Sequence, residues 1–196
     1  MKREILSFSD VRRLRRQPEF AFLAAVLLCG VLAGSFTGLR IPQAENSYAA
    51  QLAALLTQNA AGQLPTLRTT LLGFAGSFAW AAAVLITAKL WGKLIWTALV
   101  MAVRGFLLAF AAAAALIDSG IWGIYLSFVS IGISALFWVP AMLLLGTAAL
   151  VSAKEGKVYR RALVHHAGTL MFCTVLLTLS VLWRLLAVPV LAGFGR

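Results

Sequence analysis

The chain has 196 residues, of which 62% are hydrophobic and only 12% are charged. A soluble domain has too small an interior to bury so many apolar side chains, so this composition excludes a soluble enzyme or binding domain. The net charge of +11 is of the kind found in nucleic-acid-binding proteins. The distribution of the basic residues along the chain favours a membrane instead.

Five apolar stretches are each long enough for the roughly 20 helical residues that cross the hydrocarbon core of a bilayer. They predict an all-α integral membrane protein that forms one polytopic domain over residues 1–196. The five transmembrane helices are expected near residues 19–39, 69–88, 94–117, 121–152 and 163–187. Because the first stretch is a full span and leads into further spans, we expect it to stay attached as a membrane helix and not to act as a cleaved signal peptide.

The basic residues lie mostly on one side of these predicted spans. Residues 1–18 form a basic tail, and the loops around 89–93 and 154–161 are basic too, so 12 of the 17 Lys and Arg residues share a side. The positive-inside rule therefore places the amino terminus in the cytoplasm and the carboxyl terminus outside. The same residues favour anionic lipid headgroups, which accounts for the net charge without a nucleic-acid partner.

Residues 41–67 form the one long loop on the outer side of the predicted topology. Four of its residues have the spacing of an amphipathic helix, namely Tyr48, Leu52, Leu55 and Leu56. The loop is therefore predicted to contain one short external helix. That helix either lies on the outer leaflet with its leucines in the interface or docks onto an extracytoplasmic partner.

Small residues recur at four-residue intervals in the first and third predicted spans. The positions are Gly30, Gly34 and Gly38 in the first span and Gly105, Ala109 and Ala113 in the third. Such a spacing lets two membrane helices approach backbone to backbone. We therefore expect these two helices to pack closely.

The fourth run, residues 121–152, is longer than a straight crossing requires. At about 1.5 Å per residue it would reach roughly 48 Å, well beyond the hydrocarbon core. Pro140 lacks a backbone donor and clashes with the preceding helical turn. We predict a long fourth helix that is broken near Pro140 and crosses the membrane once, kinked or strongly tilted.

Side chains that support catalysis or metal binding are sparse. All six acidic residues fall in loops or at span ends, so no carboxylate is expected at midmembrane for a proton relay or a cation site. The neighbouring His165 and His166 point about 100° apart on a helix and do not converge on one metal. The sequence predicts no enzyme, no metal site and no cofactor.

Arg104 is the exception, because it lies about eleven residues after Lys93 and hence roughly 16 Å into the membrane. A midmembrane arginine costs at least about 2.5–3.5 kcal/mol on insertion scales. Three explanations stay open. In the first, the guanidinium snorkels or bonds to carbonyls freed near Pro140 and to nearby hydroxyls. In the second, it contacts an acidic group of a partner's membrane anchor or of a second copy. In the third, it lines a polar path for a substrate or ion.

Other polar residues help to separate these explanations. A transport path should gather Arg104 with Ser127, Ser130 and Ser134 around water. Arg184, which follows a tryptophan near the end of the fifth span, is expected to be an anchor at the outer interface.

The order of these features has a counterpart in a known family. It comprises a first span reading "GVLAGSFTG", an extracytoplasmic helical loop, a Trp-Gly turn at 122–123 and a proline in a long apolar run. The most specific element is a basic residue followed by Gly-Phe, here Arg104, Gly105 and Phe106. Over about residues 15–190 the chain resembles the stage II sporulation protein M family, whose members often have Lys-Gly-Phe there. It departs from them at Ala109 and Phe110, where members have a second Gly-Phe, and lacks an additional proline and polar pair.

The resemblance implies a non-catalytic membrane scaffold that assembles peptidoglycan-degrading proteins at the sporulation septum during engulfment. Its partners would be membrane-anchored cell-wall hydrolases in the bacterial plasma membrane, and a homo-oligomer stays open. Partner-binding or structural roles would fall to Arg104, Gly105, Phe106, Pro140 and the apolar residues of the external loop. The alternative, from another class of protein, is a small-solute transporter or the membrane subunit of an ATP-driven exporter.

Overall fold

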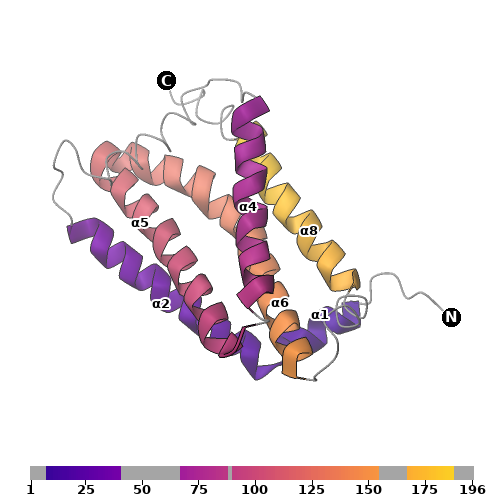
Figure 1. Ribbon diagram of the computed structural model, residues 1–196. Coiled ribbons are helices and arrows are strands. Elements are labelled where there is room, and N and C mark those ends of the chain that lie inside the picture. The colour runs from indigo at the N-terminus through magenta and orange to yellow at the C-terminus, as the bar shows by residue number, and fades with distance from the viewer. Residues whose placement is uncertain (1–7, 41–66, 88–89, 155–166, 188–196) are drawn as a thin grey trace.

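The computed structural model describes residues 8–40, 67–87, 90–154 and 167–187, and within these ranges every regular element is a helix (Figure 1). The α-helices are α1 (Phe8–Arg15), α2 (Pro18–Arg40), α4 (Leu67–Thr87), α5 (Lys93–Ser127), α6 (Ile133–Lys154) and α8 (Ala167–Leu182). Two π-helices, η1 (Phe128–Gly132) and η2 (Trp183–Ala187), precede α6 and follow α8. The all-helical prediction is confirmed for this part of the chain.

Four helical stretches in the described ranges are long and apolar enough to cross a membrane. They are Pro18–Arg40, Lys93–Ile117, Phe128–Lys154 and Gly168–Leu186. The chain is therefore a multi-pass membrane protein. Helix α4 occupies the remaining predicted span, and its shorter apolar stretch is Phe74–Thr87. A fifth crossing, by α4, stays a prediction.

Helix α6 lies at the centre of the bundle, with α2, α4, α5 and α8 packed around it (Figure 1). Residues 141–150 of α6 are all buried. A helix that is apolar on every side is suited to such a position, because it has no polar face that needs water. The surrounding helices each contribute side chains to the core, among them Leu23, Val84, Met101 and Leu177.

Helices α2 and α5 meet without intervening side chains. A Cβ atom added to Gly30 would lie 2.3 Å from the carbonyl oxygen of Ala102, and one added to Gly34 would lie 2.3 Å from that of Phe106. Both distances are shorter than any van der Waals contact, so only glycine fits at these two positions. The contact has the geometry of small-xxx-small pairs in membrane helices.

Two further contacts belong to the same interface, one at a glycine of α5 and one near the carboxyl end of α2. A Cβ atom on Gly105 would lie 2.6 Å from the carbonyl oxygen of Leu27. One on Gly38 would lie 2.6 Å from the Cβ of Ala113. The close approach therefore extends along α2 from Leu27 to Gly38.

The irregular backbone of the fourth run lies before Pro140. Gly120 has a positive φ of 58°, so the third and fourth runs meet there and not at residues 122–123. The π-helix η1 follows, and α6 then continues without interruption through Pro140. The predicted break near Pro140 is wrong. Neighbouring helices and local π-helical turns can accommodate a proline in a membrane helix, and both are present here.

One end of the bundle is basic. The helix α1, the amino ends of α2 and α5 and the carboxyl end of α6 lie together there (Figure 1). Lys154 forms an ion pair with Glu19, and the Lys93 Nζ donates a hydrogen bond of 2.7 Å to the carbonyl oxygen of Ala153. These contacts connect the ends of three helices. Arg40, at the other end of α2, is exposed.

The basic end is expected to face the cytoplasm, and site-directed labelling tests this. In a chain whose native cysteines are replaced by alanine, single cysteines at 44–60 or at the carboxyl terminus should react with an impermeant maleimide on intact cells. Cysteines at 154–161 should react only after permeabilisation. Labelling of 154–161 on intact cells would overturn the orientation.

The proposed external helix, with Tyr48, Leu52, Leu55 and Leu56, lies outside the described residues.

Candidate functional site

The guanidinium of Arg104 contacts two indole rings. Its Cζ is 5.2 Å from the ring centroid of Trp80, on α4, and 5.0 Å from that of Trp138, on α6. Each cation–π contact is worth about 0.5–1 kcal/mol at an exposed site and about 2 kcal/mol or more when desolvated. Together they offset much of the insertion cost of about 2.5–3.5 kcal/mol. The Nε atom is buried and has no hydrogen-bond partner.

The sequence did not suggest the two tryptophans. Neither belongs to a motif with Arg104, and they come from helices far apart in the chain. The signal available in the sequence was the depth of the two tryptophans within their apolar runs. Tryptophan is enriched at membrane interfaces, whereas Trp80 and Trp138 both lie well inside their apolar runs. A tryptophan at that depth is expected to contact a polar group within the bundle.

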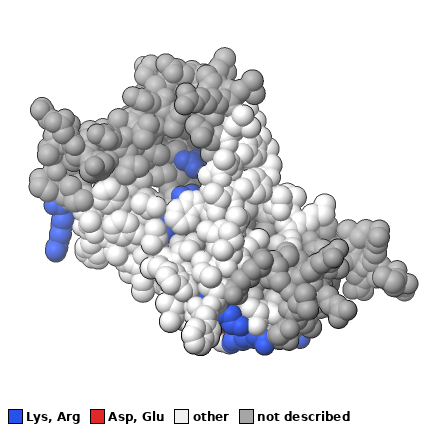
Figure 2. Space-filling model, in the orientation of Figure 1, with Lys and Arg blue, Asp and Glu red and all other residues white. Residues whose placement is uncertain are grey.

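Arg184, in η2, lies within electrostatic range of Arg104, although the sequence suggested separate roles for the two. The adjacent Trp183 donates from Nε1 to the carbonyl oxygen of Val129, in η1, at 3.0 Å. Within the described ranges, the one ion pair is the contact at the basic end, so neither arginine has a carboxylate partner there. Figure 2 shows basic atoms in a hollow beside α4 as well as at the basic end.

The serines that a polar path would gather lie apart. The Oγ of Ser134 is 2.7 Å from that of Ser180, in a buried contact between α6 and α8. The Oγ of Ser127 lies 3.5 Å from the carbonyl oxygen of Ala112, beside an apolar cavity. Ser130 is buried in η1. The hydroxyls of Ser127 and Ser134 therefore lie in separate surroundings.

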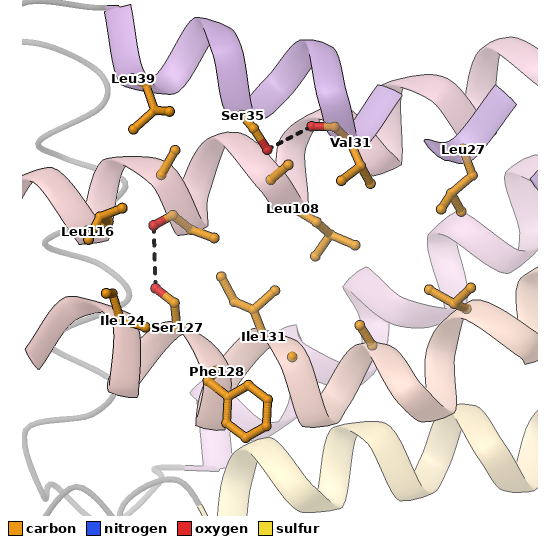
Figure 3. A pocket seen from close by; sticks show the side chains of 16 residues that line it. Leu27, Val31, Ser35, Leu39, Leu108, Leu116, Ile124, Ser127, Phe128 and Ile131 are labelled. Atoms are coloured by element: carbon orange, nitrogen blue, oxygen red, sulfur yellow. Dashed lines mark hydrogen bonds between the residues drawn. The ribbon is translucent and has the colours of Figure 1, made fainter. Parts of the chain in front are cut away.

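The cavity has a volume of about 540 Å³ and lies between α2, α5, η1 and the start of α6 (Figure 3). Apart from Ser127, the one lining side chain with a polar atom is Ser35, whose Oγ donates to the carbonyl oxygen of Val31 at 3.0 Å. Both hydroxyls thus have acceptors in the helix backbone. Arg104 does not line this cavity. The walls of the cavity suit a hydrocarbon and not a polar solute.

The residues of the basic-Gly-Phe motif face different neighbours. Arg104 contacts α4 and α6, whereas Gly105 packs against α2. Phe106 stacks on Phe110, with ring centroids 5.8 Å apart. Pro140 is half-buried within α6. The motif therefore lies where three helices meet α5.

No group of three or more His, Cys, Asp or Glu side chains in the described ranges could hold a metal ion. His165 and His166 lie outside these ranges. Comparisons of the chain with models of protein families, with curated proteins and with solved structures find no match.

Proposed function

We propose that the chain is a non-catalytic membrane scaffold that holds the transmembrane anchors of partner proteins. Arg104, a midmembrane cation with no carboxylate partner in the described ranges and with a second cation, Arg184, within electrostatic range, carries this proposal. The sequence resemblance supplies the identity of the partners. They are membrane-anchored cell-wall hydrolases, assembled at the sporulation septum during engulfment, in the plasma membrane of a spore-forming bacterium.

The energetics of the two arginines favour an anionic partner. Arg104 costs at least about 2.5–3.5 kcal/mol near midmembrane, and the like charge of Arg184, near the end of its apolar stretch, adds repulsion. The tryptophans stabilise Arg104 alone. A carboxylate beside the Arg104 guanidinium would attract it and accept charge-assisted hydrogen bonds, including one from the unpartnered Nε.

The depth of the site favours a carboxylate on a helix over a lipid phosphate. Arg104 is about 16 Å along α5 from Lys93, close to half the hydrocarbon thickness of about 30 Å. Phosphates lie at the headgroups, outside that core. An acidic side chain in a partner's transmembrane segment can reach this level, and it would need a positive partner there.

The transporter alternative receives less support. The cavity beside α2 is apolar, and two of the serines expected along a polar path, Ser127 and Ser134, are hydrogen-bonded in separate places. Neither feature offers a hydrophilic passage to a small solute.

Purification from the native host in mild detergent tests the scaffold. A tagged chain should recover membrane-anchored peptidoglycan hydrolases in amounts comparable to its own, whereas a tagged unrelated polytopic protein from the same host should not. The purified chain alone should neither cleave peptidoglycan nor hydrolyse ATP. Recovery of a transport ATPase in place of hydrolases would overturn the proposal.

A further inference from the structure

We infer that the cavity between α2, α5 and η1 binds one acyl chain of a membrane glycerophospholipid, from the leaflet at the Arg40 end. The inference rests on the cavity alone and not on the proposed scaffold function. Its four supports are the length, volume, lining and surroundings of the cavity.

The length of the cavity matches one leaflet. On α2 its lining residues run from Leu27 to Leu39, which is about 18 Å along a helix. Half of a hydrocarbon core is about 15 Å. Because α2 begins at Pro18 at the basic end, Leu27 lies about 14 Å into the helix. The cavity therefore extends from near midmembrane to the end of the bundle opposite the basic end.

The volume of the cavity favours an acyl chain over a helix as its occupant. A helix 10–12 Å across occupies on the order of 140 Å³ for each 1.5 Å of rise, so the cavity of about 540 Å³ holds only about one helical turn. A methylene group is similar in size to a water molecule, whose share of liquid is about 30 Å³. A volume of this order suits one lipid tail and is far below that of a membrane-spanning helix.

The lining explains why the space is present and what it excludes. Small side chains on α5 and α6 leave the room, among them Ala109, Ala112 and Ala135. The glycine contacts between α2 and α5 fix one wall of this space. A water molecule needs two to four polar partners, and the two hydroxyls in the wall are directed to backbone carbonyls.

The positive charge at the Arg40 end of the cavity suits a phospholipid. Arg40 follows the lining residue Leu39 and is exposed at the end of α2. An arginine can bind a phosphate through two parallel hydrogen bonds. A tail in the cavity therefore places its headgroup phosphate at the level of a cation.

Photolabelling in nanodiscs of phosphatidylglycerol and phosphatidylethanolamine tests the inference, with a phosphatidylglycerol probe that carries a diazirine on one acyl chain. Peptides from 108–116 and 124–139 should be labelled in the native chain. Ala112→Phe, which fills the cavity, should abolish this labelling. Ala33→Phe is the matched control, because Ala33 is exposed on α2 and does not line the cavity.

A milder variant keeps the test decisive if Ala112→Phe does not fold. Ala112→Leu should reduce the labelling, and added phosphatidylglycerol should raise the melting temperature of the delipidated native chain but not that of Ala112→Leu. For saturating lipid, we expect about 3–5 °C for each tenfold rise in concentration. Equal labelling of native chain and folded Ala112 variants would overturn the inference, as would a partner protein or second copy crosslinked there instead.

The headgroup is tested separately. Arg40→Gln should weaken labelling by the phospholipid probe and leave labelling by a photoreactive fatty alcohol unchanged, because the alcohol has no phosphate. Equal loss with both probes would overturn the role of the phosphate.

Discussion

Gly34→Ala should lower the melting temperature of the detergent-solubilised chain by several degrees. The new Cβ would lie 2.3 Å from the carbonyl oxygen of Phe106, and the neighbour is backbone, which cannot rotate away. Helices α2 and α5 must separate along their interface. Overpacking of this kind costs about 1–3 kcal/mol, which corresponds to about 2–4 °C per kcal/mol for a chain of this size. Thermal unfolding by circular dichroism measures the change.

Gly76→Ala is the matched control, because a Cβ atom at Gly76, on α4, meets nothing within 4 Å. It should be neutral or stabilise the helix by up to about 1 kcal/mol. Gly105→Ala should destabilise like Gly34→Ala. The double variant should lose less than the sum of both, since the helices have already moved apart. Equal melting temperatures for Gly34→Ala and Gly76→Ala would show that the two helices do not touch as described.

Arg104→Leu should leave the isolated chain folded and strongly reduce the recovery of its partners. The change removes two cation–π contacts but also a charge that is costly at midmembrane. Replacing a buried charged group by an apolar one of similar bulk is often neutral or stabilising. We therefore expect a melting temperature within a few degrees of the native value. Quantitative co-purification measures the loss of partner.

Arg104→Lys separates charge from shape. Lysine keeps the cation but has no planar group to stack on Trp80 and Trp138 or to bind a carboxylate through two hydrogen bonds. It should restore partner recovery only in part. Undiminished recovery with Arg104→Leu, accompanied by lost transport of a solute, would contradict the scaffold and favour the transporter.

Hydrophobicity and length predicted the all-helical membrane fold because both act within single segments. The four-residue spacing of Gly30, Gly34 and Gly38 indicated which face of the first span meets the third. The path of the fourth run was mispredicted because the effect of Pro140 depends on its neighbours, which a sequence does not place. The tryptophans around Arg104 were missed for the same reason, since three separate helices contribute the groups in contact.

The π-helix η1 changes the phase of the helix in which it lies. Each residue of an α-helix turns the chain by about 100°, so one additional residue in a turn rotates everything before it relative to everything after. Ile124 and Ser127, before η1, line the same cavity as Ala135 and Val139, after it. In genetic terms, deleting one codon within 128–132 would barely shorten the protein. It would instead turn the residues before η1 about the helix axis and exchange the side chains that form the cavity wall.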